Sequence, residues 1–377
     1  MVEGRAIVAD PVVAEIVWPD AVRSVRSSLN LVGSGWEPST SYWIWDRPMN
    51  DLQRTGDPCV LYFRTLRSWA TVGLTLLLYA FAISVAMGCQ QDRETPETDG
   101  AAQSNVRLAG KFRQLAVVQD DRLTEISGIA AASRAGCVWV LNDSGGKNEL
   151  YLLDDQGVCQ QTLVVDGAKA RDWEALSRVV RAGVTSLLIG DTGNNQLKQQ
   201  WLHFYLVTEP QLGGETQKAT VSQKIKLLFP DRRRDCEAVA YCGGYVYLAT
   251  KASALDKEQT QSQFFRFPLP TVDGEHELVA EALGPAPLPL ATGMDISDDG
   301  LTMVVRDYFL MAVYQRAPDQ SWESRLKQKP TLRFAGPLQK QAEAVCFSVE
   351  GGKLWTISEG RHPAWWSVDL ERGTDEQ

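Results

Sequence analysis

The chain has 377 residues, of which 44% are hydrophobic and 23% charged, and its formal net charge is −9. This composition supports a sizeable core and excludes bulk disorder. The negative charge argues against a broad electrostatic surface for nucleic acid, so we expect no nucleic-acid partner. The three histidines are far apart in the sequence, which excludes a helical His-x-x-x-His zinc site.

Residues 1–60 carry four tryptophans without a clear period. Two explanations fit this stretch. It is either a cytoplasmic extension or a segment upstream of the true translation start, which would then lie near Met49 or Val60. We favour the second explanation and assign no function to residues 1–60.

Residues 61–89 have the pattern of an export signal. Trp69–Gly88 is a run of twenty residues without a charge, Arg64 and Arg67 precede it, and Cys89 follows it. The segment resembles a bacterial lipoprotein signal, in which the cysteine is lipidated. An uncleaved anchor is an alternative, because twenty apolar residues can span a bilayer, and a simple cleaved signal is another. We predict attachment to a membrane at Cys89, with the rest of the chain in the periplasm or outside the cell.

Residues 90–105 are polar, contain Pro and Gly, and are typical of a flexible tether. The remaining residues, 106–377, contain five cysteines. An exported location permits disulfides without requiring them, and an odd number leaves at least one thiol free. The pairing is therefore left open.

Residues 106–377 contain a repeat. Five segments share one plan: an acidic residue, a short apolar strand, a turn, a second apolar strand and a polar residue where that strand ends. The acidic residues are 49, 63, 58 and 48 positions apart, close to the length of a four-stranded propeller blade. No segment shows a sustained helical period, so helices should be few. We predict an all-β fold, a β-propeller of five four-stranded blades, with six blades as the alternative.

Hairpin geometry places the chemistry of this domain at one end. The first strand of an antiparallel hairpin starts where the second strand stops, so the acidic and the exit residues should form two rings around a channel mouth. The predicted inner ring is Glu125, Glu174, Glu237, Asp295 and Glu343. The predicted second ring is Asp143, Asp191, Lys251, Arg306 and Glu359, and Lys169, Arg171, Asp172, Arg234 and Asp235 lie near it in sequence.

Carboxylates at this density repel one another unless cations intervene, and hard oxygen ligands suit Ca²⁺. The candidate metal ligands are Glu125, Glu174, Glu237, Asp295, Glu343, Asp143 and Asp191. Arginine and lysine suit a phosphate or carboxylate, so we expect an anionic small molecule at Lys169, Arg171, Arg234, Lys251 and Arg306. In the alternative interpretation, each acid bonds backbone N–H groups of the neighbouring blade and locks the ring.

Several short runs resemble a bacterial family of exported phytase-like propellers described as having the "esterase-like activity of phytase". They are Leu141–Gly145, Ala168–Glu174, Gly190–Asn195, Arg234–Ala238, Ala291–Asp295 and Ala342–Val345, within roughly residues 115–370. The resemblance implies a calcium-binding channel. In that case the five inner-ring acids would be calcium ligands, and Lys169, Arg171, Lys251 and Arg306 would contact phosphate.

Three functions are compatible with this sequence. The first is a binding or scaffold propeller at the cell envelope, and the second is a calcium-dependent phosphoester hydrolase in the phytase style. The third is a metal-assisted esterase or lactonase. The run Asn142–Gly146 looks like a serine-protease motif, but no histidine lies in a partner motif. The chain also lacks a Gly-x-Ser-x-Gly elbow, which weakens a serine esterase.

Overall fold

The computed structural model describes residues 106–143, 147–214 and 216–372. The predicted extension (1–60), signal with Cys89 (61–89) and tether (90–105) lie outside the described residues. Within the described part, no helix is long and apolar enough to cross a membrane.

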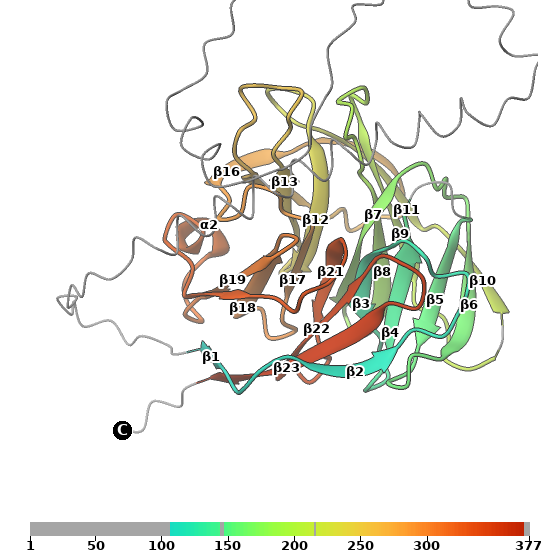
Figure 1. Ribbon diagram of the computed structural model, residues 1–377. Coiled ribbons are helices and arrows are strands. Elements are labelled where there is room, and N and C mark those ends of the chain that lie inside the picture. The colour runs from blue at the N-terminus through green and yellow to red at the C-terminus, as the bar shows by residue number, and fades with distance from the viewer. Residues whose placement is uncertain (1–105, 144–146, 215, 373–377) are drawn as a thin grey trace, which may run out of the picture. The chain divides into compact units, whose positions relative to one another are not determined.

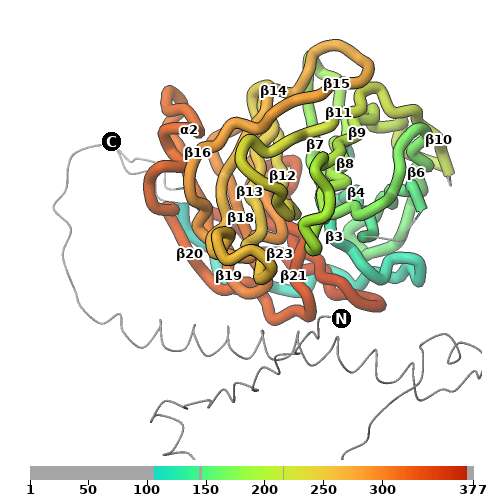
Figure 2. Tube along the Cα trace, turned by 90° about the horizontal axis from the view of Figure 1, so that it is seen from above, coloured from blue at the N-terminus to red at the C-terminus, as the bar shows by residue number. Residues whose placement is uncertain are grey.

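Five mainly antiparallel sheets surround a common axis, and each contains one blade (Figures 1 and 2). Blade 1 consists of β3 (Ile126–Ala131), β4 (Val138–Asn142), β5 (Glu149–Leu153) and β6 (Cys159–Asp166). Blade 2 consists of β7 (Trp173–Arg181), β8 (Val184–Asp191), β9 (Leu202–Thr208) and β11 (Gln223–Leu228). Blade 3 consists of β12 (Asp235–Cys242), β13 (Tyr245–Lys251), β14 (Gln263–Pro268) and β16 (Glu281–Pro285).

Blade 4 consists of β17 (Gly293–Ile296), β18 (Thr302–Arg306), β19 (Leu310–Gln315) and β20 (Leu332–Ala335), and the short α2 (Trp322–Arg325) lies between its last two strands in the chain. Blade 5 consists of β21 (Ala342–Phe347), β22 (Lys353–Ser358) and β23 (Ala364–Arg372). The all-β class and the five-bladed propeller are thereby confirmed.

The N-terminal strands close the ring. β1 (Val106–Leu108) and β2 (Arg113–Val117) both pair antiparallel with β23, the last strand of the chain. The fourth position of blade 5 is therefore filled from the other end of the domain. The two ends of the propeller are held together by backbone hydrogen bonds, which protect an edge that would otherwise be open.

Two further strands link neighbouring blades. β10 (Thr216–Thr220) lies between β9 and β11 in the chain but pairs in parallel with β6 of blade 1. β15 (Gly274–Val279) lies between β14 and β16 but pairs in parallel with β11 of blade 2. Each crosses back to the preceding blade and covers its outer edge.

The core is divided into five apolar clusters, each between two neighbouring blades. The inner strands are buried on both faces, so β3 and β21 are buried along their whole length. Small residues allow these strands to approach. A Cβ added at Gly128 would lie 2.8 Å from the backbone nitrogen of Leu176, and one at Gly293 would lie 2.3 Å from the carbonyl oxygen of Glu343. The five cysteines of the described domain are all free thiols.

Three polar side chains on or next to the inner strands lock adjacent blades. The carboxylate of Asp295 in β17 accepts a hydrogen bond of 2.8 Å from the backbone N–H of Phe347 in β21. The Ser127 hydroxyl donates to the carbonyl of Trp173, and the Thr292 hydroxyl donates to the carbonyl of Ala342. Burial raises the pKa of Asp295 to about 7. Asp295 was also a predicted metal ligand, and its position supports the locking interpretation instead.

We expect Asp295→Asn to change how stability depends on pH. Between the reference pKa of 3.8 and about 7, the folded chain keeps a proton that the unfolded chain releases. The free energy of unfolding therefore falls as pH rises through this window. The neutral amide does not titrate, so this loss of stability with rising pH should be absent from the variant. Between pH 5 and pH 8 the free energy of unfolding of Asp295→Asn should therefore rise by about 1–2 kcal/mol relative to the parent.

Urea unfolding at several pH values measures this difference. Asp319→Asn is the matched control, because Asp319 is exposed. Identical pH slopes for the parent and Asp295→Asn would contradict the assignment.

Candidate functional site

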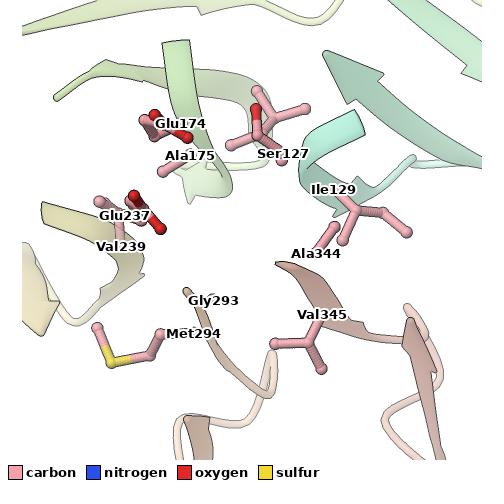
Figure 3. A pocket seen from close by; sticks show the side chains of 12 residues that line it. Ser127, Ile129, Glu174, Ala175, Glu237, Val239, Gly293, Met294, Ala344 and Val345 are labelled. Atoms are coloured by element: carbon pink, nitrogen blue, oxygen red, sulfur yellow. The ribbon is translucent and has the colours of Figure 1, made fainter. Parts of the chain in front are cut away.

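A β-bulge places one glutamate of each of three inner strands at the channel axis. The register shifts across Glu174 in β7, across Glu237 in β12 and across Glu343 in β21. Figure 3 shows Glu174 and Glu237 from neighbouring strands with Ser127 beside them. Ser127 occupies the bulge of β3, and Thr292 precedes β17. This ring therefore has three carboxylates and two hydroxyls.

The free space enclosed by the inner strands at this ring is small. The free space beside Glu174 and Glu237 has a volume of about 10 Å³, which is close to the room needed for one water molecule. Larger apolar side chains line it, namely Ile129, Leu176, Val239, Met294 and Val345. A ligand larger than water must therefore approach the carboxylates from the mouth.

One lysine is held among the acids. Lys251 Nζ donates to both carboxylate oxygens of Glu237, at 2.6 and 2.7 Å, and to the Tyr308 hydroxyl at 2.9 Å. The Glu237 side chain is 4% exposed and that of Lys251 is 12% exposed. Burial opposes the charge on Lys251, but the attraction of Glu237 outweighs it and raises the pKa of the amine. The pair is thus a buried, hydrogen-bonded salt bridge.

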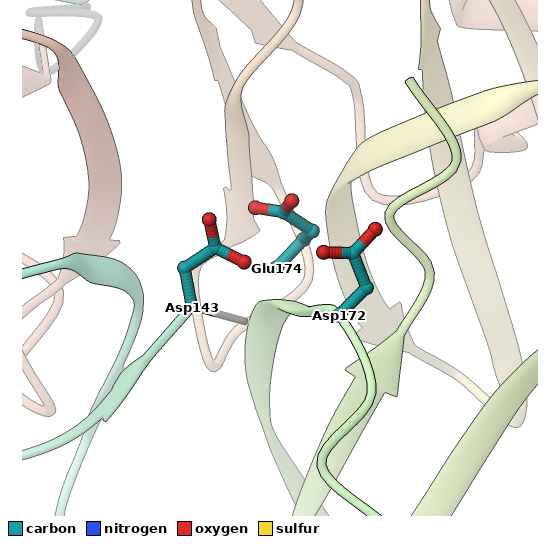
Figure 4. A group of neighbouring side chains, drawn as sticks. All are labelled: Asp143, Asp172 and Glu174. Carbon is teal, nitrogen blue, oxygen red and sulfur yellow. The ribbon is translucent and has the colours of Figure 1, made fainter. Parts of the chain in front are cut away.

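A second group at the mouth consists of three carboxylates. Carboxylate oxygens of Asp143, Asp172 and Glu174 all lie within 4.8 Å of one another (Figure 4). Asp143 follows β4, and Asp172 immediately precedes β7. The Glu174 side chain is 4% exposed, and it forms no hydrogen bond with a described residue. Burial and the repulsion of Glu237 raise its pKa well above the ordinary range, and burial also raises the pKa of Asp172.

Gly193 gives this group its room. A Cβ at this position would lie 2.4 Å from an oxygen of Asp172 and 2.7 Å from an oxygen of Glu174. Any side chain here would push the carboxylates apart. The glycine in the loop after β8 is thus required by the close approach of backbone and carboxylates.

Two further acids complete the mouth. Glu343 and Glu359 interact with each other, and burial raises the pKa of both. Asp235 accepts a hydrogen bond from the backbone N–H of Asn194. Burial and the repulsion of Glu237 raise its pKa to about 7.

The predicted rings are assembled in part. The structure brings Glu174, Glu237, Glu343, Asp143 and Lys251 together at the mouth, and Glu359 joins them. Glu125 is exposed just before β3, and its backbone N–H donates to the Asn142 side chain. Asp191, at the end of β8, accepts from the backbone N–H of Asp172 and lies 3.4 Å from Arg171. These two acids frame the mouth without joining the carboxylate group.

The predicted basic residues are mostly engaged elsewhere. Arg234 is bonded to Asp231 at 2.6 Å and its guanidinium lies over the Phe265 ring. Arg306 is fully buried between blades 4 and 5, bonded to Thr356 and to backbone carbonyls. Lys169 is exposed on the loop before β7.

Sequence reasoning missed the roles of Tyr308 and of the two hydroxyl residues, and it left Asp172 and Asp235 outside the candidate ligands. The sequence does contain a pattern that points to Asp172 and Asp235. Both stand two positions before a ring glutamate, in Asp172-Trp-Glu174 and Asp235-Cys-Glu237. This shared Asp-x-Glu pattern in two consecutive blades marks both as residues of the mouth.

No protein-family model matches the chain, and no curated protein matches its sequence. Among solved structures, the chain is similar to the Neurospora crassa Pan2 WD40 domain at 12% identity, over 68% of this chain and 95% of that chain, with a TM-score of 0.35. It is also similar to the Dos1 propeller at 11% identity, over 65% and 68%, with a TM-score of 0.32. The blade count rests on the strand pairing described above, and the phytase-like resemblance stays a prediction.

The buried pair generates a stability prediction. Lys251→Met should destabilise the propeller by about 3–5 kcal/mol, because it leaves Glu237 buried without a counter-charge. Adding Glu237→Gln to this variant should restore part of the loss. Denaturant unfolding measures both, and Lys353→Met on the exposed part of β22 is the control. A loss below about 1 kcal/mol would show that water already screens the pair.

Proposed function

We propose that this propeller is a non-catalytic binding module whose acidic mouth holds a divalent cation, with Ca²⁺ as the first candidate. The observation that supports the proposal is the convergence of Asp143, Asp172 and Glu174, whose carboxylate oxygens all lie within 4.8 Å of one another. Glu174 is the decisive member, since it is almost fully buried and has no hydrogen bond to a described residue. Burying a carboxylate in this state is costly unless it is protonated or bound by a cation.

The charge of the whole mouth supports the same proposal. Lys251 is paired with Glu237, Arg171 acts on Asp172, and Lys340 acts on Glu359. The carboxyl groups gathered there are Asp143, Asp172, Glu174, Asp235, Glu237, Glu343 and Glu359. The excess of negative charge favours a cationic ligand. Oxygen ligands at this density are typical of Ca²⁺, which tolerates irregular geometry, more than of Mg²⁺, which requires a near-ideal octahedron.

Most of the predicted basic residues already interact with groups of the protein itself, which favours binding over phosphoester hydrolysis. An anionic substrate needs cations that are available to it. Of the five predicted cations, Lys251 is bonded to Glu237, Arg234 to Asp231, and Arg306 is buried away from the mouth, which leaves Lys169 and Arg171. We therefore place the phytase-style hydrolase and the metal-assisted esterase or lactonase behind the binding module. Purified protein with calcium should hydrolyse neither phytate nor simple carboxyl esters.

Calcium should stabilise the folded protein. A ligand that binds only the native state adds about 2.7 kcal/mol at a hundredfold excess over its dissociation constant. The thermal midpoint of the parent at pH 7.5 should rise in millimolar calcium. Glu174→Gln and Asp172→Asn keep the side-chain size, remove one charge each, and should lose most of this rise.

Asp319→Asn, which changes an exposed acid outside the mouth, should keep the full rise. Magnesium at the same concentration should have a smaller effect. No shift of the parent in calcium would end the cation proposal. A shift that survives both mouth variants would place the ion elsewhere.

We further propose that the module is attached to the cell envelope through Cys89, with the propeller in the periplasm or outside the cell. The support is the sequence pattern of residues 61–89. Cys89→Ser should abolish incorporation of a radioactive fatty acid into the full chain, while the parent is labelled. Equal labelling of the two proteins would refute attachment at this residue.

A further inference from the structure

A groove on the outer side of blades 4 and 5 is not used by the acidic mouth. Its volume is about 420 Å³, within the usual size of ligand pockets. The connection between β1 and β2 forms one wall, and the end of β20 with the following loop forms the other. The lining residues are Leu108, Gly110, Lys111, Phe112, Ala335, Gly336, Pro337, Leu338 and Trp366.

The walls of the groove are apolar and partly open to solvent. Leu338 is 95% exposed, the highest value among the large hydrophobic residues of the described domain. Phe112 and Trp366 add aromatic surface, and Pro337 stiffens the loop. A groove with aromatic and aliphatic walls and few polar groups is typical of a site for a small molecule with an apolar body.

The charges at this groove are positive. Lys111 is exposed at its wall and forms no ion pair with a described residue. Arg306 lies behind the opposite wall. A Cβ on Gly336 would lie 3.7 Å from its Nη2 atom, and Nη2 is buried without a hydrogen-bond partner among the described residues. None of the described residues that line the groove is acidic.

We propose that this groove binds an amphipathic anion, a carboxylate with an unbranched apolar chain. The chain would lie against Phe112, Leu338 and Trp366, and the carboxylate would face Lys111. The buried guanidinium of Arg306, whose Nη2 atom lies behind the thin wall at Gly336, would add positive potential there, partly offset by Asp307 and Glu343. This site is separate from the cation site and does not depend on it.

A photo-crosslinking experiment tests the site on the full chain, held in lipid nanodiscs. The probe is decanoate with a diazirine in its chain, and labelled peptides are mapped by mass spectrometry. We expect labels within residues 108–112 and 335–338, removed by competition with unlabelled decanoate. A diazirine-bearing decylamine should label these peptides several-fold less, because its charge is repelled.

Variants separate the apolar and the charged contributions. Leu338→Asp should abolish labelling of the groove, and Lys111→Met should reduce it about fivefold, as expected for an exposed charge pair. Lys353→Met removes an exposed lysine elsewhere on blade 5 and should leave labelling unchanged. Thermal midpoints equal to that of the parent show that each variant is folded. Equal labelling by the acid and the amine, or full labelling of Leu338→Asp, would overturn the proposal.

Discussion

The close approach of the five inner strands is the constraint on which the rest of this domain depends. Glycine and alanine let neighbouring inner strands touch through their backbones, and at Gly128 and Gly293 even a methyl group would overlap the next blade. The ring is therefore tight, and its channel has room for little more than a water molecule. Side chains that emerge at the start of these strands are forced together in a small, poorly solvated space.

Three of those side chains are glutamates, so the same constraint creates an electrostatic problem. The protein solves it in different ways around the ring. Glu237 is neutralised by Lys251, and burial raises the pKa of both Glu343 and Glu359, which favours their uncharged forms. Glu174 forms neither a salt bridge nor a hydrogen bond with a described residue, and burial and the repulsion of Glu237 raise its pKa. The proposed cation completes this series, because it supplies at Glu174, Asp172 and Asp143 the positive charge that Lys251 supplies at Glu237.

The fold could be predicted from the sequence because the patterns that specify it are local. Apolar strands, turns and their spacing set five hairpins, and each hairpin is contained in a short stretch of chain. The parallel strands β10 and β15 were not accessible, because they pair with the preceding blade through contacts that no local pattern encodes. Ring closure by β1 and β2 has the same non-local character.

The site was accessible only in part, because one residue of register decides which side chain faces the axis. The bulges in β7, β12 and β21 turn Glu174, Glu237 and Glu343 inward. In blades 1 and 4 the equivalent positions are Ser127 and Thr292, so Glu125 lies outside the ring and Asp295 lies within the blade interface. Arg306 ends β18, but its side chain runs between blades 4 and 5 rather than into the mouth.

The central claim is that the carboxylates of blades 1 and 2 form a cation site. Anomalous diffraction from crystals of the protein grown with calcium tests it most directly. The account predicts one calcium peak at about 2.3–2.6 Å from carboxylate oxygens of Asp143, Asp172 and Glu174. An empty position between these three residues at saturating calcium and neutral pH would contradict it, and Glu174 would then have to be a buried, protonated acid.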